Sequence, residues 1–112
     1  MRKKENLLGM IGLCNRSGKI IIGSERIAQA AQRGQVKLLV CAQDTGVNTQ
    51  KTVEKIAKNH HIPLLVLFSK EELGPMAGKQ EASVVAVCDK GFAASILKKS
   101  EELRGGDMHG SI

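Results

Sequence analysis

The stretch that decides the fold runs from Lys19 to Asp44 and reads K-I-I-I-G-S-E-R-I-A-Q-A-A-Q-R-G-Q-V-K-L-L-V-C-A-Q-D. Its pattern predicts a short strand, a glycine turn, a basic helix and then a buried strand. The turn places the first N–H groups of the helix, which lack partners within the helix, near Lys19, Arg26 and Arg33. A helix start of this kind favours a phosphate group. The stretch therefore predicts a site for a phosphate-bearing ligand.

Four apolar runs lack the polar alternation of a half-exposed strand and cover residues 20–22, 38–42, 64–68 and 84–88. Such continuous runs are typical of strands covered on both faces. Helical patterns lie between them, at residues 5–15 and 24–33, after a cap at Asn48, from a cap at Ser69 to a stop at Gly74 and Pro75, and after Asp89. This alternation predicts a three-layer α/β/α sandwich, formed by a single domain at residues 1–104 and followed by a flexible tail at residues 105–112.

The charge of the chain is unevenly placed. The 112 residues have a net charge of +6, and the first 37 residues hold eight Lys or Arg against two acidic residues, so the whole excess lies there. This asymmetry predicts a polyanionic partner, with a basic surface that serves solubility as the alternative. Lys51, Lys55 and Lys58 recur at i, i+4 and i+7, and we interpret them as a solvated helix face, with phosphate contact as the alternative.

Two patterns bear on the location and on the partner. Cys14, Cys41 and Cys88 are widely spaced and odd in number, which favours a reducing, cytoplasmic location over a disulfide framework. No apolar run approaches the ~18 residues of a membrane span, so no membrane partner is expected. Because Phe68 and Phe92 are the only aromatic residues, an RNA partner would be recognised by shape, phosphates and polar contacts instead of aromatic stacking.

Catalytic, cofactor and metal sites are not predicted. The glycine–lysine segments at residues 12–19 and 74–79 miss the spacing of a P-loop, and no nucleophile lies beside a base in the sequence. His60 and His61 are adjacent, so they point in different directions, and no further ligand stands at metal-binding spacing. We therefore expect no enzyme, no cofactor and no metal ion, and an enzyme or a nucleotide-binding α/β domain is the least favoured alternative.

The predicted helix at residues 24–33 has a polar face that suits nucleic acid. Arg26, Gln29 and Arg33 share this face at i, i+3 and i+7. Arg26 suits a guanine edge or a phosphate, and Gln29 offers both donors and an acceptor to a base edge. Glu25 would accept a hydrogen bond from an amino group on a base. An ordinary solvated helix face is the alternative.

Phosphate contacts are expected from the same stretch. The glycine turn and the helix start supply backbone N–H groups, and nearby cationic side chains add charge. The residues expected to contact phosphate are Lys19, Gly23, Ser24, Arg33 and Lys37, whereas Glu25, Arg26 and Gln29 are expected to meet base edges.

The loop at residues 76–79 is a second candidate site. Its glycines and small residues predict a tight, exposed turn between a helix and a strand, and such loops often carry function. Met76 and Ala77 at its tip would press apolar surface against an unstacked base, and Gly78 and Lys79 complete the turn. The alternative is a turn that only ends a helix.

Many residues spread over the chain match a known pattern, namely Gly18-Lys19, Gly23, Arg33-Gly34, Val36-Lys37-Leu38, Ala42 with Asp44, Asn48-Thr49, Ser69-Lys70, Leu73-Gly74, Ala77-Gly78-Lys79, Val84–Val87 and Asp89-Lys90-Gly91-Phe92. Over about residues 5–100 the chain resembles the kink-turn RNA-binding ribosomal proteins, the superfamily of the large-subunit proteins seven-Ae and thirty-e. Within it, the chain is most similar to the bacterial YlxQ-type proteins.

The resemblance implies a mixed four-stranded sheet and binding to a kink-turn in structured RNA, either ribosomal RNA or another kink-turn-like RNA. Ribosomal proteins are further candidate partners. In that superfamily Asn, Glu and Lys at the second helix contact the sheared G·A pairs, and a loop clasps an extruded base. This chain has Glu25, Arg26 and Gln29 at the three helix positions and Lys79 where the loop usually has an apolar residue.

Two hypotheses of different classes follow. The first is a non-catalytic RNA-binding protein associated with the ribosome or with structured RNA. The second, favoured by the replacements at Glu25, Arg26 and Gln29, is a protein-interaction module that keeps the scaffold without kink-turn recognition.

Overall fold

The computed structural model describes the backbone of residues 2–111 and the side chains of residues 3–103. Its elements alternate along the chain as α1 (Arg2–Arg16), β1 (Ile20–Ile22), α2 (Ser24–Gln32), β2 (Leu38–Cys41), α3 (Val47–His60), β3 (Leu64–Val66), α4 (Lys70–Met76), β4 (Val84–Val87) and α5 (Lys90–Ser111). Helices and strands therefore follow the order that the apolar runs predict.

The four strands form one mixed sheet in the order β1-β4-β2-β3. β4 is antiparallel to both β1 and β2, whereas β2 and β3 are parallel. Ala86 lies between Ile21 on β1 and Leu39 on β2. Because β1, β2 and β3 run in the same direction, their carboxyl ends meet at one edge of the sheet, where β4 begins.

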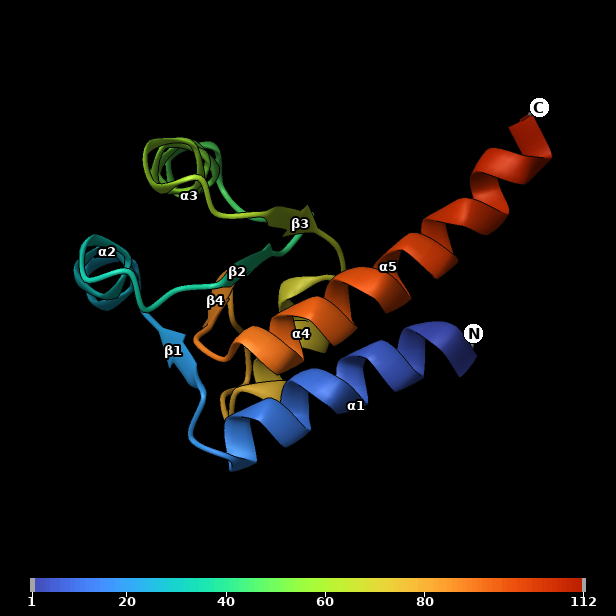
Figure 1. The fold of residues 1–112 in the computed structure, drawn as a ribbon, viewed down its shortest axis with the longest axis horizontal. Coiled ribbons are helices and arrows are strands. Elements are labelled where there is room, and N and C mark those ends of the chain that lie inside the picture. The colour runs from blue at the N-terminus through green and yellow to red at the C-terminus, as the bar shows by residue number, and fades with distance from the viewer. Residues whose placement is uncertain (1, 112) are drawn as a thin grey trace.

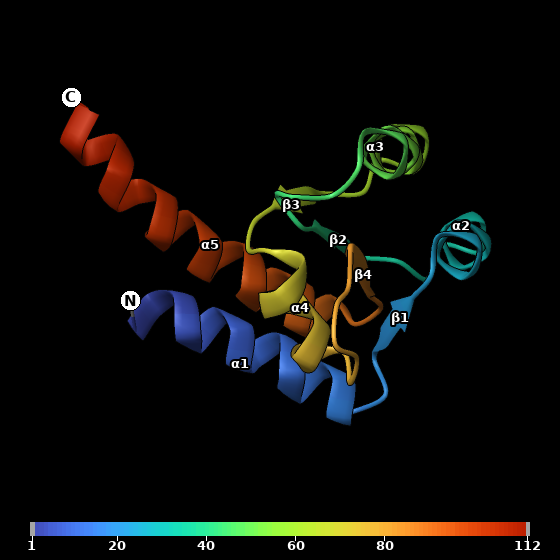
Figure 2. The ribbon, with the colours of Figure 1, turned by 180° about the vertical axis from the view of Figure 1, so that it is seen from behind.

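Helices cover both faces of the sheet. Figures 1 and 2 show α2 and α3 side by side on one face, and α1, α4 and α5 on the other. Side chains of β2 and β4 alternate between two cores, so that Val40 and Val85 face α1, α4 and α5 while Leu39 and Ala86 face α2 and α3. This double burial explains the continuous apolar runs, and the predicted three-layer α/β/α sandwich with a mixed four-stranded sheet is confirmed.

Of three predicted helix ends, one is right and two are wrong. Ser69 caps α4 as predicted, because its hydroxyl accepts from the N–H of Glu72 and the Glu72 carboxylate accepts from the N–H of Ser69. Asn48 does not cap α3, since the helix begins at Val47 after Gly46. Gly74 and Pro75 do not end α4, which continues to Met76.

The last helix extends beyond its predicted pattern. Backbone of α5 stays helical to Ser111, through most of the segment expected to be a flexible tail. The side chains after Leu103 lie outside the described ones. The single domain at residues 1–104 and the flexibility of residues 105–112 stay predictions.

The capping box of α4 makes stability depend on pH. The Lys4 ammonium, which pairs with Glu72 at 2.6 Å, and then the N–H of Ser69 hold the pKa of the Glu72 carboxyl below its ordinary value. A depressed pKa stabilises the fold above the unfolded-state value and loses that contribution as the pH falls through the folded-state value. We therefore expect the free energy of unfolding to fall below about pH 4.5, and Glu72→Gln to remove part of that fall.

Denaturant unfolding at a series of pH values measures this dependence. Glu71→Gln is the matched control, because Glu71 is the exposed neighbour and does not join the capping box. Equal pH profiles for the two variants would show that Glu72 is not the source.

Candidate nucleic-acid interface

A hollow of about 310 Å³ lies at the edge of the sheet where β1 and β2 end and β4 begins. Three stretches of chain, distant in sequence, form it: the end of β1 with the start of α2, the start of α3, and the loop before β4. Its lining residues are Ile22, Gly23, Ser24, Thr49, Lys79, Glu81, Ala82, Ser83 and Val84. The carboxyl edge of such a sheet is the general position of ligand sites in α/β proteins.

Two helices begin beside the hollow, and neither has a side-chain cap. Gly23 is the N-cap of α2 and Gly46 is the N-cap of α3, and no side chain accepts from the first turn of either helix. The first-turn N–H groups of both helices therefore remain available to an external acceptor. The two helices start at the same sheet edge, so the positive ends of their dipoles lie on the same side of the molecule.

The turn before α2 requires glycine. Gly23 has a φ of 92°, a conformation that side-chain-bearing residues rarely adopt, and a Cβ there would meet open space. The position therefore keeps the approach to the helix start unobstructed. This arrangement provides an open surface of backbone donors, as an anion site needs.

The first turns of α2 present the predicted polar face to solvent. Ile27 and the two alanines Ala30 and Ala31 are buried and fix the helix against the sheet. Ser24, Glu25, Arg26 and Gln29 are exposed. The apolar stripe thus orients the helix so that its charged and amide groups lie outward, and of these four residues Ser24 lines the hollow.

The loop that forms the opposite wall of the hollow is held tightly to α4. A Cβ on Gly74 would lie 2.5 Å from backbone atoms of Gln80 and Glu81, so the loop occupies the place of a side chain. The N–H of Lys79 donates to the carbonyl of Gly74 at 2.9 Å, and the N–H of Ala82 donates to that of Lys70 at 3.1 Å. These contacts give the wall a defined position.

The loop tip differs from the prediction. Ala77 is buried, and Met76 is half-buried against the core that faces α1. Gly78, with a φ of 77°, reverses the chain at that point. Both side chains contribute to the core, which reduces the apolar surface that they present outward. Their contact with an unstacked base stays a prediction. Lys79 is exposed and lines the hollow.

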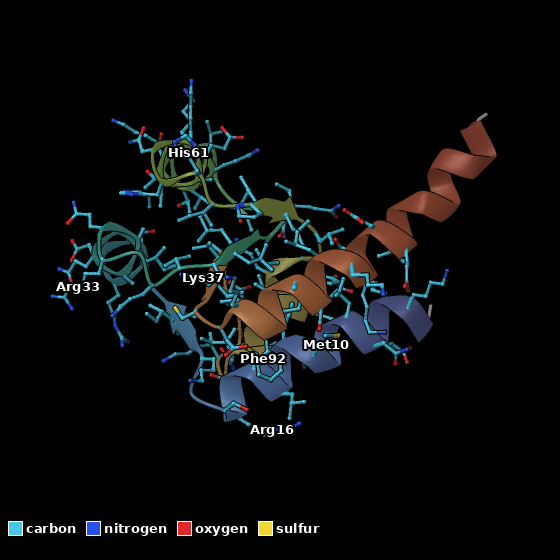
Figure 3. All side chains as sticks on the ribbon, viewed as in Figure 1. Met10, Arg16, Arg33, Lys37, His61 and Phe92 are labelled. Atoms are coloured by element: carbon cyan, nitrogen blue, oxygen red, sulfur yellow. The ribbon has the colours of Figure 1, made fainter. Side chains whose placement is uncertain are left out.

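Three predicted cationic residues lie at the other end of the molecule. Lys19 precedes β1 and Arg33 follows α2, so each stands about 13 Å from the start of α2 at the rises of a strand and a helix. The ammonium of Lys37 donates to the carbonyl of Gly34 at 2.9 Å, and Lys37 lines a separate hollow of about 260 Å³ beside His60 and His61. Figure 3 shows Arg33, Lys37 and His61 around the ends of α2 and α3. The structure therefore divides the predicted cationic cluster in two.

The structure adds residues that the sequence did not indicate as a site. Thr49 and Ser83 line the hollow, from α3 and from the start of β4. The hydroxyl of Thr45 donates to the carbonyl of Ser83 at 3.2 Å and fixes that wall. In the sequence, Thr49 is only part of the family-like pattern, and no local signal brings these segments together.

Reactive groups are not gathered at the hollow. Burial raises the pKa of Cys14 to about 11 and also raises the pKa of Cys41 and Cys88, so all three remain neutral thiols near pH 7. Among the side chains of residues 3–103, no three His, Cys, Asp or Glu residues are grouped to hold a metal ion. Within the part of the chain that the structure describes, no helix has both the length and the apolar character to span a membrane.

Residues 5–97 match the sequence profile of the Ribosomal protein L7Ae/L30e/S12e/Gadd45 family. The chain belongs to this family. The resemblance inferred from the residue pattern is thereby confirmed.

Two relatives are described as RNA-binding protein YlxQ. The protein from Enterococcus faecium is 33% identical over 100 residues, which cover 89% of this chain and 92% of the relative. The protein from Bacillus subtilis (strain 168) is 31% identical over 88 residues, covering 79% and 88%. The large ribosomal subunit protein eL8 of Thermoplasma volcanium is 29% identical over 107 residues, covering 89% and 87%. None of these family relatives is an enzyme, and the prediction of a non-enzymatic protein is confirmed.

Solved structures share the fold. A protein of unknown function from Bacillus halodurans C superposes with a TM-score of 0.79 at 31% identity, covering 83% of this chain and 94% of that protein. The Giardia lamblia 15.5kD RNA binding protein superposes with a TM-score of 0.73, covering 92% and 91%. At 20% identity, the second likeness shows the fold alone.

Proposed function

We propose that the protein is a non-catalytic RNA-binding protein of the cytoplasm that holds a bent, kink-turn-like segment of structured RNA at the hollow. The observation that carries this proposal is the meeting of two uncapped helix starts and an exposed lysine around one open site. Ribosomal RNA is the proposed target class, and ribosomal proteins are proposed as neighbours. The RNA-binding names of the YlxQ relatives support the choice of RNA as the polyanion.

The residues divide into two roles. Gly23 and Ser24 would hold a backbone phosphate through main-chain N–H groups, and Lys79 would face it from the opposite wall. Arg26 and Gln29, on the exposed face of α2, would meet base edges. Glu25 lies in the first turn of α2 and would accept a hydrogen bond from a base amino group. Its carboxylate would then face a base and not a phosphate, which carries the same sign of charge.

Gel shifts at several salt concentrations test this function. A kink-turn RNA is compared with an unrelated duplex of equal length, and we expect tighter binding to the kink-turn RNA at each salt concentration. Because released counterions drive phosphate contacts, affinity should fall as salt rises. Equal affinity for the two RNAs would remove the kink-turn proposal.

A protein-interaction module is the second candidate. The inward packing of Met76 and Ala77 favours it, because the loop then presents less apolar surface to an extruded base. Pull-down from cell extract with and without ribonuclease separates the two functions. Partners retained after ribonuclease treatment would favour the module, and partners lost with the RNA would count against it.

A further inference from the structure

The outer face of α3 carries three exposed lysines that are not part of the hollow. Lys51, Lys55 and Lys58 are exposed. The buried side of the helix is formed by Val53, Ile56 and Ala57. At 100° per residue, the three lysines lie opposite the centre of that buried side, so they point away from the sheet.

These lysines are not neutralised within the described part of the molecule. No ion pair involves any of them among the side chains of residues 3–103, where the recorded pair is Lys4 with Glu72. Glu54 is the only acidic residue of α3; it stands three residues after Lys51 and four before Lys58, so it offsets part of their charge, and it accepts from the Gln50 amide at 3.5 Å. The helix face therefore keeps an excess of positive charge.

The opposite layer of the sandwich shows a different arrangement. Lys98 and Lys99 on α5 are followed by Glu101 and Glu102 at spacings of three and four residues. Neighbours at these helical spacings offset one another's charge. A net cationic surface is thus a property of α3 and not of every exposed helix.

The three lysines follow one another along α3, on the other side of the helix from the hollow. Thr49, in the first turn of α3, lines the hollow, and Lys51 follows two residues later. From Lys51 the next lysines stand about 6 Å and then about 4.5 Å farther along the helix axis. Lys51 stands about 160° around the helix from Thr49, so a stem reaches the lysines once it passes around the start of α3, and it then meets one cation after another.

We propose that the outer face of α3 binds the phosphate backbone of an RNA stem that continues from the segment held at the hollow. This inference rests on the proposed function and extends it from the bend to the adjoining helix. The occupant is a double-stranded RNA backbone, because three ammonium groups complement phosphates and RNA stems are recognised mostly through shape and backbone contacts. Contact there would be independent of base sequence.

Two RNAs and two triple variants test the inference. One RNA carries the kink-turn with its stem ending at the bend, and the other extends the same stem by about one helical turn. The test variant is K51Q/K55Q/K58Q, and the matched control is K3Q/K98Q/K99Q, which removes the same charge from exposed positions of α1 and α5. All six positions are exposed, so both variants should fold.

We expect wild type to bind the longer RNA more tightly than the shorter one. The α3 variant should lose most of that gain, with a slope of log affinity against log salt that is smaller by about 2 to 3. The affinity of the α3 variant for the short RNA should remain within about twofold of wild type, because its contacts at the bend are unchanged. The affinities of the control variant for the short and the long RNA should also remain within about twofold of wild type.

Several results would overturn the inference. Tight binding of the short RNA with no gain from the longer stem would contradict it and leave the proposed function standing. Equal losses in the two triple variants would show a general charge effect. Competition by polyglutamate as strong as that by duplex RNA would assign the face to acidic proteins. Failure of wild type to prefer the kink-turn RNA over a plain duplex would remove both proposals together.

Discussion

Gly74→Ala is expected to lower the free energy of unfolding by at least about 2 kcal/mol and to weaken RNA binding strongly. A Cβ at this position would lie 2.5 Å from the carbonyl group of Gln80 and from the Cα of Glu81. These are backbone atoms, which cannot move aside as a flexible side chain can. The loop must therefore leave α4, which breaks the bond from the Lys79 N–H to the Gly74 carbonyl and displaces one wall of the hollow.

Two other helical glycines supply a graded control. A Cβ on Gly9 meets nothing within 4 Å, so Gly9→Ala should stabilise the protein by up to about 1 kcal/mol through helix propensity. A Cβ on Gly12 meets the sulfur of Met76 at 3.3 Å, and that side chain can shift, so an intermediate effect is expected. Denaturant unfolding ranks the three variants. A Gly74→Ala protein as stable as Gly9→Ala would show that the loop is not held as described.

Features of the fold that depend on local pattern are predictable from the sequence. Four-residue runs such as Val84–Val87 are buried on both faces, and the Ser69 cap has its partner three residues away. The start of α3 was missed, because Gly46 takes the extended N-cap conformation ahead of Asn48. Proline normally disrupts a helix interior, and α4 continues for only one residue past Pro75, so the helix ends close to the predicted stop.

The candidate site was only partly predictable. The polar face of α2 follows from helical periodicity, so the exposure of Arg26 and Gln29 is predictable, whereas their contact with RNA stays a prediction. Lys19 and Arg33 are close to the start of α2 in sequence, which predicts one cluster. In the structure, the length of β1 separates Lys19 from that helix start, and the length of α2 separates Arg33 from it. Thr49 reaches the hollow only because β1 and β2 run in the same direction, which a single sequence does not reveal.

The double substitution Arg26→Ala with Lys79→Ala should reduce affinity for kink-turn RNA more than either change alone. If Arg26 reads a base, its loss should cost on the order of 1–3 kcal/mol and relax preference at one position of the RNA. Lys79 faces the hollow from the other wall, so its loss should weaken binding uniformly across sequences and reduce the salt slope by about one. Titration of base-substituted RNAs at several salt concentrations measures both effects.

A second double variant, Arg16→Ala with Lys98→Ala, removes the same charge from exposed positions on the opposite layer and should leave affinity nearly unchanged. Figure 3 shows Arg16 at the end of α1, on the side of the sheet away from α2 and α3. The two single variants at the hollow must also differ in kind, since a base contact changes specificity while a phosphate contact changes the salt response. If Arg26→Ala altered only the salt slope, Arg26 would be a phosphate contact, and recognition of bases at the bend would have to come from Gln29 and Glu25.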